Sequence, residues 1–392
     1  MGVGQAVLAA IFFLVAQANA IAVLSIDTLS SICATLFGLI TLWLLVPGDF
    51  SAESVALRRL SQYCFAPLTF LLSLLSKESG VSVWPMAVVC LAAFPEVAHS
   101  KPIDWRRKRQ LILVALPLLL VLLLYLVLRS ATGATPAEIG QGPYQFRVGL
   151  NIPSNLAMVL GAALTPVSTV SIMNALSRGD TAFLLAAGLV TGGSFLVAVY
   201  GLWCDGRSWL WLTASTFAVL SLFPMVMLNH VSEMYAYAAM PFAGMLLGGG
   251  WAAALERLRA RRPVFVLGSI GLAGLLLLNV AGIQSKAHLM VANGEAVQRI
   301  LLQLKEFIPA IPANGRLLLI NPPSPVRSSY SVFVVNGFDV FEGRRETVYK
   351  SGDRSDFGVR IVDAEALTPE MLTPETLAVT LELGRIVLYA GS

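Results

Sequence analysis

The chain has 392 residues, of which 56% are hydrophobic and only 13% are charged. Soluble proteins carry about 25% charged residues, so this chain cannot fold as one water-facing globule. Its net charge of +4 is small and forms no basic stripe with interleaved aromatic residues, which argues against nucleic-acid binding. The composition predicts an integral membrane protein.

Nine apolar runs are long enough, or nearly so, to cross the roughly 30 Å hydrocarbon core of a bilayer. They are predicted as transmembrane helices near residues 4–24, 28–46, 60–76, 80–97, 110–128, 182–203, 208–228, 235–253 and 263–283. A tenth run, 154–176, is interrupted by Pro166 and diluted by Ser and Thr.

The charges of the loops indicate how the tenth run is placed. If 154–176 does not cross, twelve basic loop residues lie on one side and four on the other, before the C-terminal tail. If it crosses, each side has eight. Because basic loops concentrate on the cytoplasmic side, we expect 154–176 to be re-entrant or interfacial, with the C-terminal tail outside.

The composition changes after Ile283. Residues 285–307 carry apolar side chains at helical spacing, which predicts an amphipathic helix. Strands are predicted at 316–321, 330–335 and 385–390. We therefore predict a mostly α fold of two domains. A transmembrane helix bundle, with about nine spans and one re-entrant or interfacial segment, occupies 1–283, and a small soluble exoplasmic α/β domain occupies 284–392.

Lys77 and Glu78 interrupt an apolar stretch that runs from Leu68 to Phe94. At the centre of a membrane helix each charge would cost about 2.5–3.5 kcal/mol, so the pair predicts a tight turn at headgroup level. One interpretation is a hairpin whose charged ends reach the interface. The other is a functional site, in which Lys77 binds a lipid phosphate and Glu78 orients it.

A second polar cluster lies in the segment 229–237, NHVSEMYAY, between two predicted spans on the same outer side. His230 and Glu233 are three residues apart, so one helical turn would bring them to one face. Tyr235 and Tyr237 fit either an interfacial aromatic belt or the wall of a site. The combination of a histidine, a carboxylate and two phenols favours a site.

The long outer segment 129–153 contains Arg147 and leads into 154–176. Membrane-edge elements of this kind can shape a groove for a lipid-linked substrate. A passive loop is an equal alternative, and the sequence leaves both open.

Several short motifs together resemble those of GT-C type membrane glycosyltransferases, which use polyprenyl-phosphate-linked sugars. The segment 71–80, LLSLLSKESG, with Pro85 after it, is similar to the "LLSKE…P" hairpin of bacterial relatives of the protein O-mannosyltransferases. The segment 230–237 is similar to their later "hxxExxY" outer loop, and ATLFGL at 34–39 to their third span. The likeness covers about residues 15–285.

This resemblance implies inverting transfer of a sugar from a polyprenyl phosphate to an exoplasmic glycan, lipid or protein. Lys77 and His230 would bind the phosphate, and the candidate catalytic carboxylates Glu78 and Glu233 would orient them. The remaining substrate-binding candidates are Tyr235, Tyr237 and Arg147. The resemblance indicates no definite cofactor and leaves a divalent metal open. It places the protein in a bacterial inner membrane, with the C-terminal domain in the periplasm.

The chain departs from the family pattern at two places. The family usually has a first span followed by an outer loop with an acidic catalytic residue, and neither is found before the run 4–24. We therefore expect either a truncated start or a chain that is no longer catalytic. The segment 17–29 keeps Asn19 and Asp27 but lacks the basic residue that usually precedes the aspartate, and Met234 likewise stands where relatives often have arginine.

Two other classes of protein compete with this reading. A transporter or lipid flippase would show paired half-helices or ionisable residues deep in the spans. A polysaccharide polymerase or ligase would have a larger, arginine-rich outer loop.

Overall fold

The computed structural model describes residues 2–24, 29–46, 59–98, 105–132, 146–223, 225–228, 232–307, 316–320, 359–362, 367–372, 376–382 and 385–389. The chain is mostly helical and divides into two compact units, Met1–Lys286 and Ala287–Ser392. The predicted boundary between residues 283 and 284 falls inside one continuous helix, α13.

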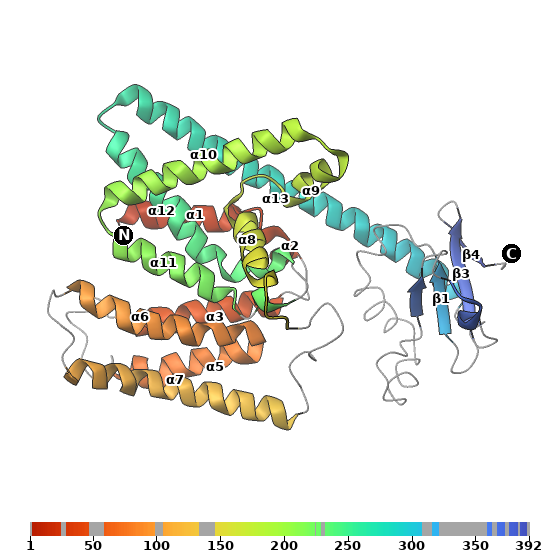
Figure 1. Cartoon of the computed structure of the whole chain (residues 1–392), viewed down its shortest axis with the longest axis horizontal. Helices are drawn as coiled ribbons and strands as arrows, with labels where there is room; N and C mark the ends of the chain where they lie inside the picture. Colours follow the sequence, from red (N-terminus) through yellow and green to blue (C-terminus); the bar gives the residue numbers. More distant parts are fainter. Residues whose placement is uncertain are drawn as a thin grey trace. The chain divides into compact units, whose positions relative to one another are not determined.

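The first unit is built from helices (Figure 1). The α-helices are α1 (Val3–Val15), α2 (Asn19–Leu24), α3 (Leu29–Leu45), α5 (Ala66–Ser76), α6 (Val83–Ala98), α7 (Trp105–Ala131), α8 (Asn151–Leu164), α9 (Thr169–Arg178), α10 (Thr181–Asp205), α11 (Ser208–Ser221), α12 (Met240–Leu258) and α13 (Arg262–Phe307). Short π and 3-10 helices between them are η2 (Ser61–Phe65), η3 (Glu78–Ser82), η4 (Met225–Met227) and η5 (Glu233–Ala238).

Three described helical segments are long and apolar enough to cross a membrane: Ile112–Ala131, Thr181–Asp205 and Arg262–Ala292. The pair α8 and α9 would be a fourth if it formed one span, and several other apolar helices are shorter. Large side chains such as Leu189 and Leu277 are exposed on these helices, as expected for a surface that faces lipid. The structure is consistent with a membrane protein, but the predicted nine full spans are not confirmed.

Helix α12 packs closely against α1 and α10 through glycines. A Cβ atom added to Gly248 would lie 2.6 Å from Ala9 Cα, and one added to Gly201 would lie 1.8 Å from the Gly250 carbonyl oxygen. Such distances are possible only because glycine has no side chain. Small residues commonly allow close helix packing in membranes.

We predict that Gly201→Ala destabilises the protein by about 1–3 kcal/mol, because the added methyl group forces α10 away from α12. Gly192→Ala on the same helix is the matched control, since nothing lies within 4 Å of its added Cβ. The control should be neutral or stabilising by up to about 1 kcal/mol, because alanine favours helix. Unfolding in detergent measures both, and equal effects of the two substitutions would contradict the packing.

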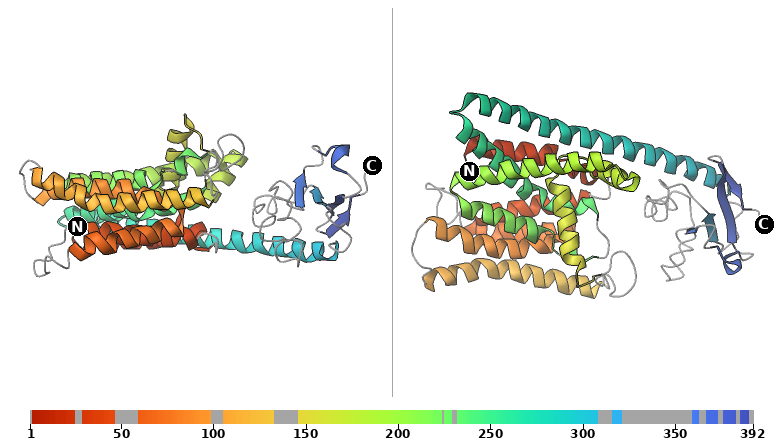
Figure 2. Two further views of the ribbon diagram at one scale, coloured as in Figure 1. Left: turned by 90° about the horizontal axis from the view of Figure 1, so that it is seen from below. Right: turned by 45° about the horizontal axis from the view of Figure 1, so that its top comes forward.

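Polar contacts distinguish the two ends of the first unit. Its long helices run roughly side by side between these ends, whereas α8 lies across them (Figure 2). At one end, the Gln5 side chain in α1 donates to Asp205 at the end of α10, over 3.0 Å. At the other, Ser79 of η3 and Ala238 of η5 line the same cavity. Gln17 follows α1 at the end opposite Gln5. It accepts a hydrogen bond from Lys286, which also donates to Glu233 of η5. We call this second end the site end.

Helices α8 and α9 are bent by 117° relative to each other. In α8, Asn155 donates to the carbonyl oxygens of Val226 and Leu228, over 2.9 and 2.8 Å. In α9, the Thr169 hydroxyl donates to Glu233 over 2.8 Å. Both arms therefore contact the connection between α11 and α12, at the site end.

The second unit contains a four-stranded sheet of order β2-β1-β3-β4. Its strands are β1 (Arg316–Ile320), β2 (Val359–Val362), β3 (Thr376–Glu382) and β4 (Arg385–Leu388). Strand β1 is parallel to β2 and β3, whereas β4 is antiparallel to β3. The predicted strands at 316–321 and 385–390 correspond to β1 and β4, and the one at 330–335 lies outside the described residues. The α/β domain predicted over 284–392 is not confirmed as a whole.

Candidate functional site

Lys77 lies between α5 and η3, and Glu78 is the first residue of η3, so the helix is interrupted at the predicted pair. Lys77 is half-buried, and its ammonium group donates to the Ser31 hydroxyl at the start of α3, over 2.7 Å. Glu78 has a 54% exposed side chain and faces Arg129 at the end of α7, with 4.0 Å between Nη1 and Oε2. An exposed pair at this distance contributes little to stability, so Glu78 is free to interact with a ligand.

Glu233, at the start of η5, is paired with Lys286 of α13. The lysine side chain is 1% exposed and that of the glutamate 10% exposed. One Glu233 oxygen, Oε1, accepts from Lys286 and the other, Oε2, accepts from Thr169. Taking two charges out of water is costly unless they are paired and hydrogen-bonded, so each partner depends on the other.

Lys286 also binds the break between α1 and α2. Its ammonium donates to the backbone oxygen of Gln17, over 3.1 Å, and to the Gln17 side-chain oxygen. The Gln17 side chain in turn donates to the carbonyl oxygens of Ala162 and Thr165, and its backbone N–H donates to Asn279. This network joins the α1–α2 break, α8 and α13, and through Glu233 it includes η5.

Tyr235 and Tyr237 are both 8% exposed. The ring of Tyr237 packs against Phe13 of α1, with 5.9 Å between the ring centroids. Both tyrosines are therefore buried, and Tyr237 packs η5 against α1.

Arg147 lies near η4 and has an exposed side chain. Its backbone N–H donates to the Met227 oxygen over 2.7 Å, and Phe146 forms an isolated β-bridge with Leu228. Residues 146 and 147, which precede α8, are thereby attached to the connection that leads to η5. His230, the other predicted phosphate ligand, lies outside the described residues.

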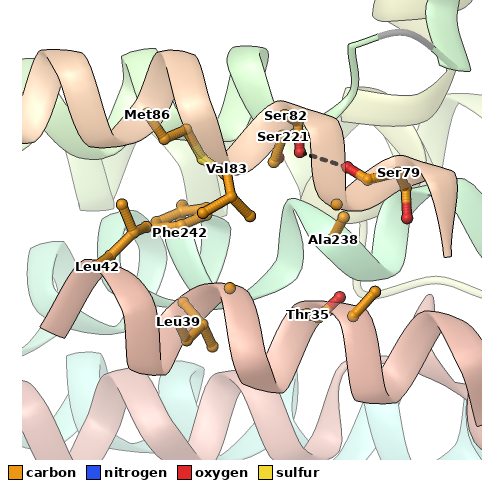
Figure 3. A pocket seen from close by; sticks show the side chains of 13 residues that line it. Thr35, Leu39, Leu42, Ser79, Ser82, Val83, Met86, Ser221, Ala238 and Phe242 are labelled. Carbon is orange, nitrogen blue, oxygen red and sulfur yellow. Dashed lines mark hydrogen bonds between the residues drawn. The ribbon is translucent and has the colours of Figure 1, made fainter. Parts of the chain in front are cut away.

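A small cavity of about 20 Å³ lies between the two predicted site segments. Figure 3 shows Thr35 and Leu39 of α3 on one side and Ser79 and Ser82 on the other, with Ala238 of η5 beside them. A volume of this size holds about one water molecule. The two segments thus converge on α3, but their charged groups have different partners: Lys77 and Glu78 contact α3 and α7, whereas Glu233 contacts α9 and α13.

A much larger apolar groove, of about 770 Å³, lies between α10, α12 and α13. Its lining includes Trp251, whose indole N–H donates to Ser194 over 3.2 Å. The groove extends along α13 to Ala281, five residues before Lys286. At about 1.5 Å per residue, this is roughly 7.5 Å along the helix axis.

Lys286 lies near one end of its candidate span. It follows Arg262 by 24 residues, and no residue between them is charged. At about 1.5 Å per residue this corresponds to about 36 Å, slightly more than the hydrocarbon thickness of roughly 30 Å. Both charges therefore fit at opposite headgroup levels, and the Glu233–Lys286 pair fits the edge of the membrane.

Sequence reasoning missed Lys286 and Gln17. Lys286 was assigned to an amphipathic helix beyond the last span, and Gln17 to the interior of the first. One signal was available: Asn279, Gly282 and Lys286 recur at helical spacing and form a polar and small stripe. Glycine at position 282 allows α13 to lie close to the α1–α2 break, since a Cβ atom added there would be 2.9 Å from the Gln17 Cβ.

The cluster combines an ammonium, a carboxylate and neutral hydrogen-bonding groups in a largely water-free place. Such groups can bind an anion and accept a proton from a hydroxyl. Among the described residues, no three His, Cys, Asp or Glu side chains are grouped so as to hold a metal ion.

Comparisons of the chain with models of protein families, with curated proteins and with solved structures found no match.

Proposed function

We propose that this chain is a membrane glycosyltransferase of the GT-C type, which moves a sugar from a polyprenyl phosphate to an exoplasmic acceptor. The observation that carries the proposal is the buried Glu233–Lys286 pair beside the end of an apolar groove. The groove suits a hydrocarbon chain, and a cation next to its end suits the phosphate of the same lipid.

The arrangement at the membrane edge supports the proposal. Both arms of the bent α8–α9 pair contact the site end, which supports the proposal that 154–176 is a re-entrant segment. Arg147 and the Lys77–Glu78 turn lie at this end too. A lipid-linked sugar carries its reactive bond at headgroup level, where these polar groups gather.

In the proposed reaction, a carboxylate takes the proton of the acceptor hydroxyl, whose oxygen attacks the anomeric carbon of the sugar. The bond between this carbon and the phosphate oxygen breaks, and polyprenyl phosphate leaves with both electrons of that bond. Glu233 is the buried carboxylate nearest to a fixed cation, so we assign it the role of base. Lys286, with Lys77 as a second cation, stabilises the charge on the leaving phosphate.

The proposal is tested with the purified chain in lipid nanodiscs and a panel of polyprenyl-phosphate-linked hexoses and pentoses. Time-dependent release of polyprenyl phosphate, with a hydroxylated acceptor present, is the expected result. A complete lack of release across the panel, from protein that is folded by its thermal transition, would refute the proposal.

A second candidate, a lipid flippase, is favoured by one observation. Lys286 is an ionisable residue inside a candidate span, which is common in transporters. Its place near the end of that span favours the transferase. In proteoliposomes, a flippase would move a fluorescent polyprenyl-phosphate sugar between leaflets without releasing polyprenyl phosphate.

A further inference from the structure

We infer that Lys286 and Glu233 form an exchangeable ion pair, in which the phosphate of the bound lipid replaces Glu233 on the Lys286 ammonium. This inference rests on the proposed function and extends it to the order of events at the site. The exchange would free the Glu233 carboxylate as the ligand binds, so that the base becomes available only when the donor is in place.

The contacts of Lys286 show what is fixed and what can be exchanged. Two of its acceptors are the backbone and side-chain oxygens of Gln17. Gln17 is fully buried and belongs to the break between α1 and α2. These acceptors are neutral, so the ammonium still requires one anion. In the structure that anion is Glu233.

Glu233 is the partner that can leave. Its side chain is 10% exposed, against 1% for Lys286, so it lies on the open side of the pair. It is carried by η5, a single short 3-10 segment, whereas Lys286 lies within the long helix α13. When the carboxylate leaves, Thr169 loses the acceptor of its hydroxyl group and can donate to a phosphate oxygen instead.

Unpaired polar atoms provide a second, independent indication of a ligand here. Among the described residues, the Asn19 carboxamide oxygen and the Ser168 hydroxyl are buried without a hydrogen-bond partner. Asn19 is 5% exposed and Ser168 6% exposed. Asn19 belongs to α2, which contacts η5, and Ser168 directly precedes Thr169. Buried polar groups are normally satisfied. The Ser168 hydroxyl can donate to a phosphate oxygen, whereas the Asn19 oxygen can only accept and is available to a hydroxyl group of the ligand.

Exchange makes a prediction of unusual sign: removing the carboxylate should improve binding. Calorimetric titration in detergent micelles compares geranylgeranyl phosphate with its uncharged alcohol, geranylgeraniol. For the wild-type protein we expect the phosphate to bind at least about tenfold more tightly than the alcohol. Glu233→Gln removes the competing anion and should tighten phosphate binding by a further factor of about ten, without changing binding of the alcohol.

The double variant Lys286→Met/Glu233→Gln replaces both charged side chains with neutral ones of similar volume. It should bind geranylgeranyl phosphate and geranylgeraniol equally. If Glu233→Gln alone does not fold, the comparison of the wild-type protein with the double variant still tests whether Lys286 binds the phosphate. Phosphate binding by Glu233→Gln that is no tighter than wild type would overturn the inference. The inference would also be overturned if the double variant still preferred the phosphate and Lys77→Met lost that preference. That result would assign the phosphate to Lys77 and would leave the proposed function intact. Wild-type protein that binds neither probe would overturn both.

Discussion

Replacing Lys286 with methionine is expected to lower the free energy of unfolding by about 3–5 kcal/mol. The substitution keeps the length of the side chain but removes the only charge that faces the buried Glu233 carboxylate in the described part of the chain. It also leaves the two Gln17 oxygens without their common donor. Unfolding of the purified protein in mixed micelles, followed by the loss of helix, measures the effect.

The double variant Lys286→Met/Glu233→Gln provides the matched comparison. Removing both charges avoids an unpaired buried ion, so most of the lost stability should return. Lys77→Met removes a half-buried lysine whose hydrogen-bond partner among the described residues is the Ser31 hydroxyl, and should cost no more than about 1.5 kcal/mol. A Lys286→Met protein as stable as the wild type would contradict the buried pair.

Replacing Glu233 with glutamine is expected to reduce the release of polyprenyl phosphate from a lipid-linked sugar by at least about 100-fold. The carboxamide keeps the shape of the side chain but cannot accept the proton of the acceptor hydroxyl, and a positioned base typically contributes 10²–10⁴-fold. KM for the donor should not rise, because the phosphate retains its cation. Single-turnover and steady-state rates of donor cleavage in nanodiscs separate the two parameters.

Glu256→Gln is the control for this substitution. Glu256 is exposed and lies near the end of α12 that is remote from η5, so its replacement should leave the rate unchanged. Glu233→Gln protein that turns over donor at the wild-type rate would exclude Glu233 as the base. An equal loss in both variants would indicate a general effect on the bundle.

The sequence predicted the class of the fold better than its details. Apolar runs such as 182–203 and 110–128 predicted α10 and the apolar part of α7, because the thickness of the bilayer fixes the length of a span. The first run, 4–24, is instead divided into α1 and α2. Its break is stabilised by contacts of Gln17 with Asn279 and Lys286, and contacts so distant in the sequence leave no mark on the hydropathy of the run itself. The single helix α13 likewise covers a predicted span and a predicted amphipathic helix.

The candidate site was also predicted only in part from the sequence. Local sequence predicted the break between helices at Lys77 and Glu78, because two charges in an apolar stretch are costly inside a membrane helix. Glu233 was also selected, but its partner was not, since 53 residues separate it from Lys286. Charge counting within loops treats each residue separately and cannot predict a pair formed between distant helices. The partners expected for Glu233 were instead the neighbouring residues of its own loop.

The central claim is that the site end and the opposite end of the helical unit face different sides of the membrane, with the Glu233–Lys286 pair at the exoplasmic headgroup level. Single cysteines introduced as Arg147→Cys and Arg259→Cys, in a chain without its native cysteines, test this with a membrane-impermeant maleimide on sealed vesicles of known orientation. The account predicts labelling of position 147 only from the exoplasmic side and of position 259 only from the cytoplasmic side. Labelling of both positions from one side, or of position 147 from the cytoplasm, would contradict it.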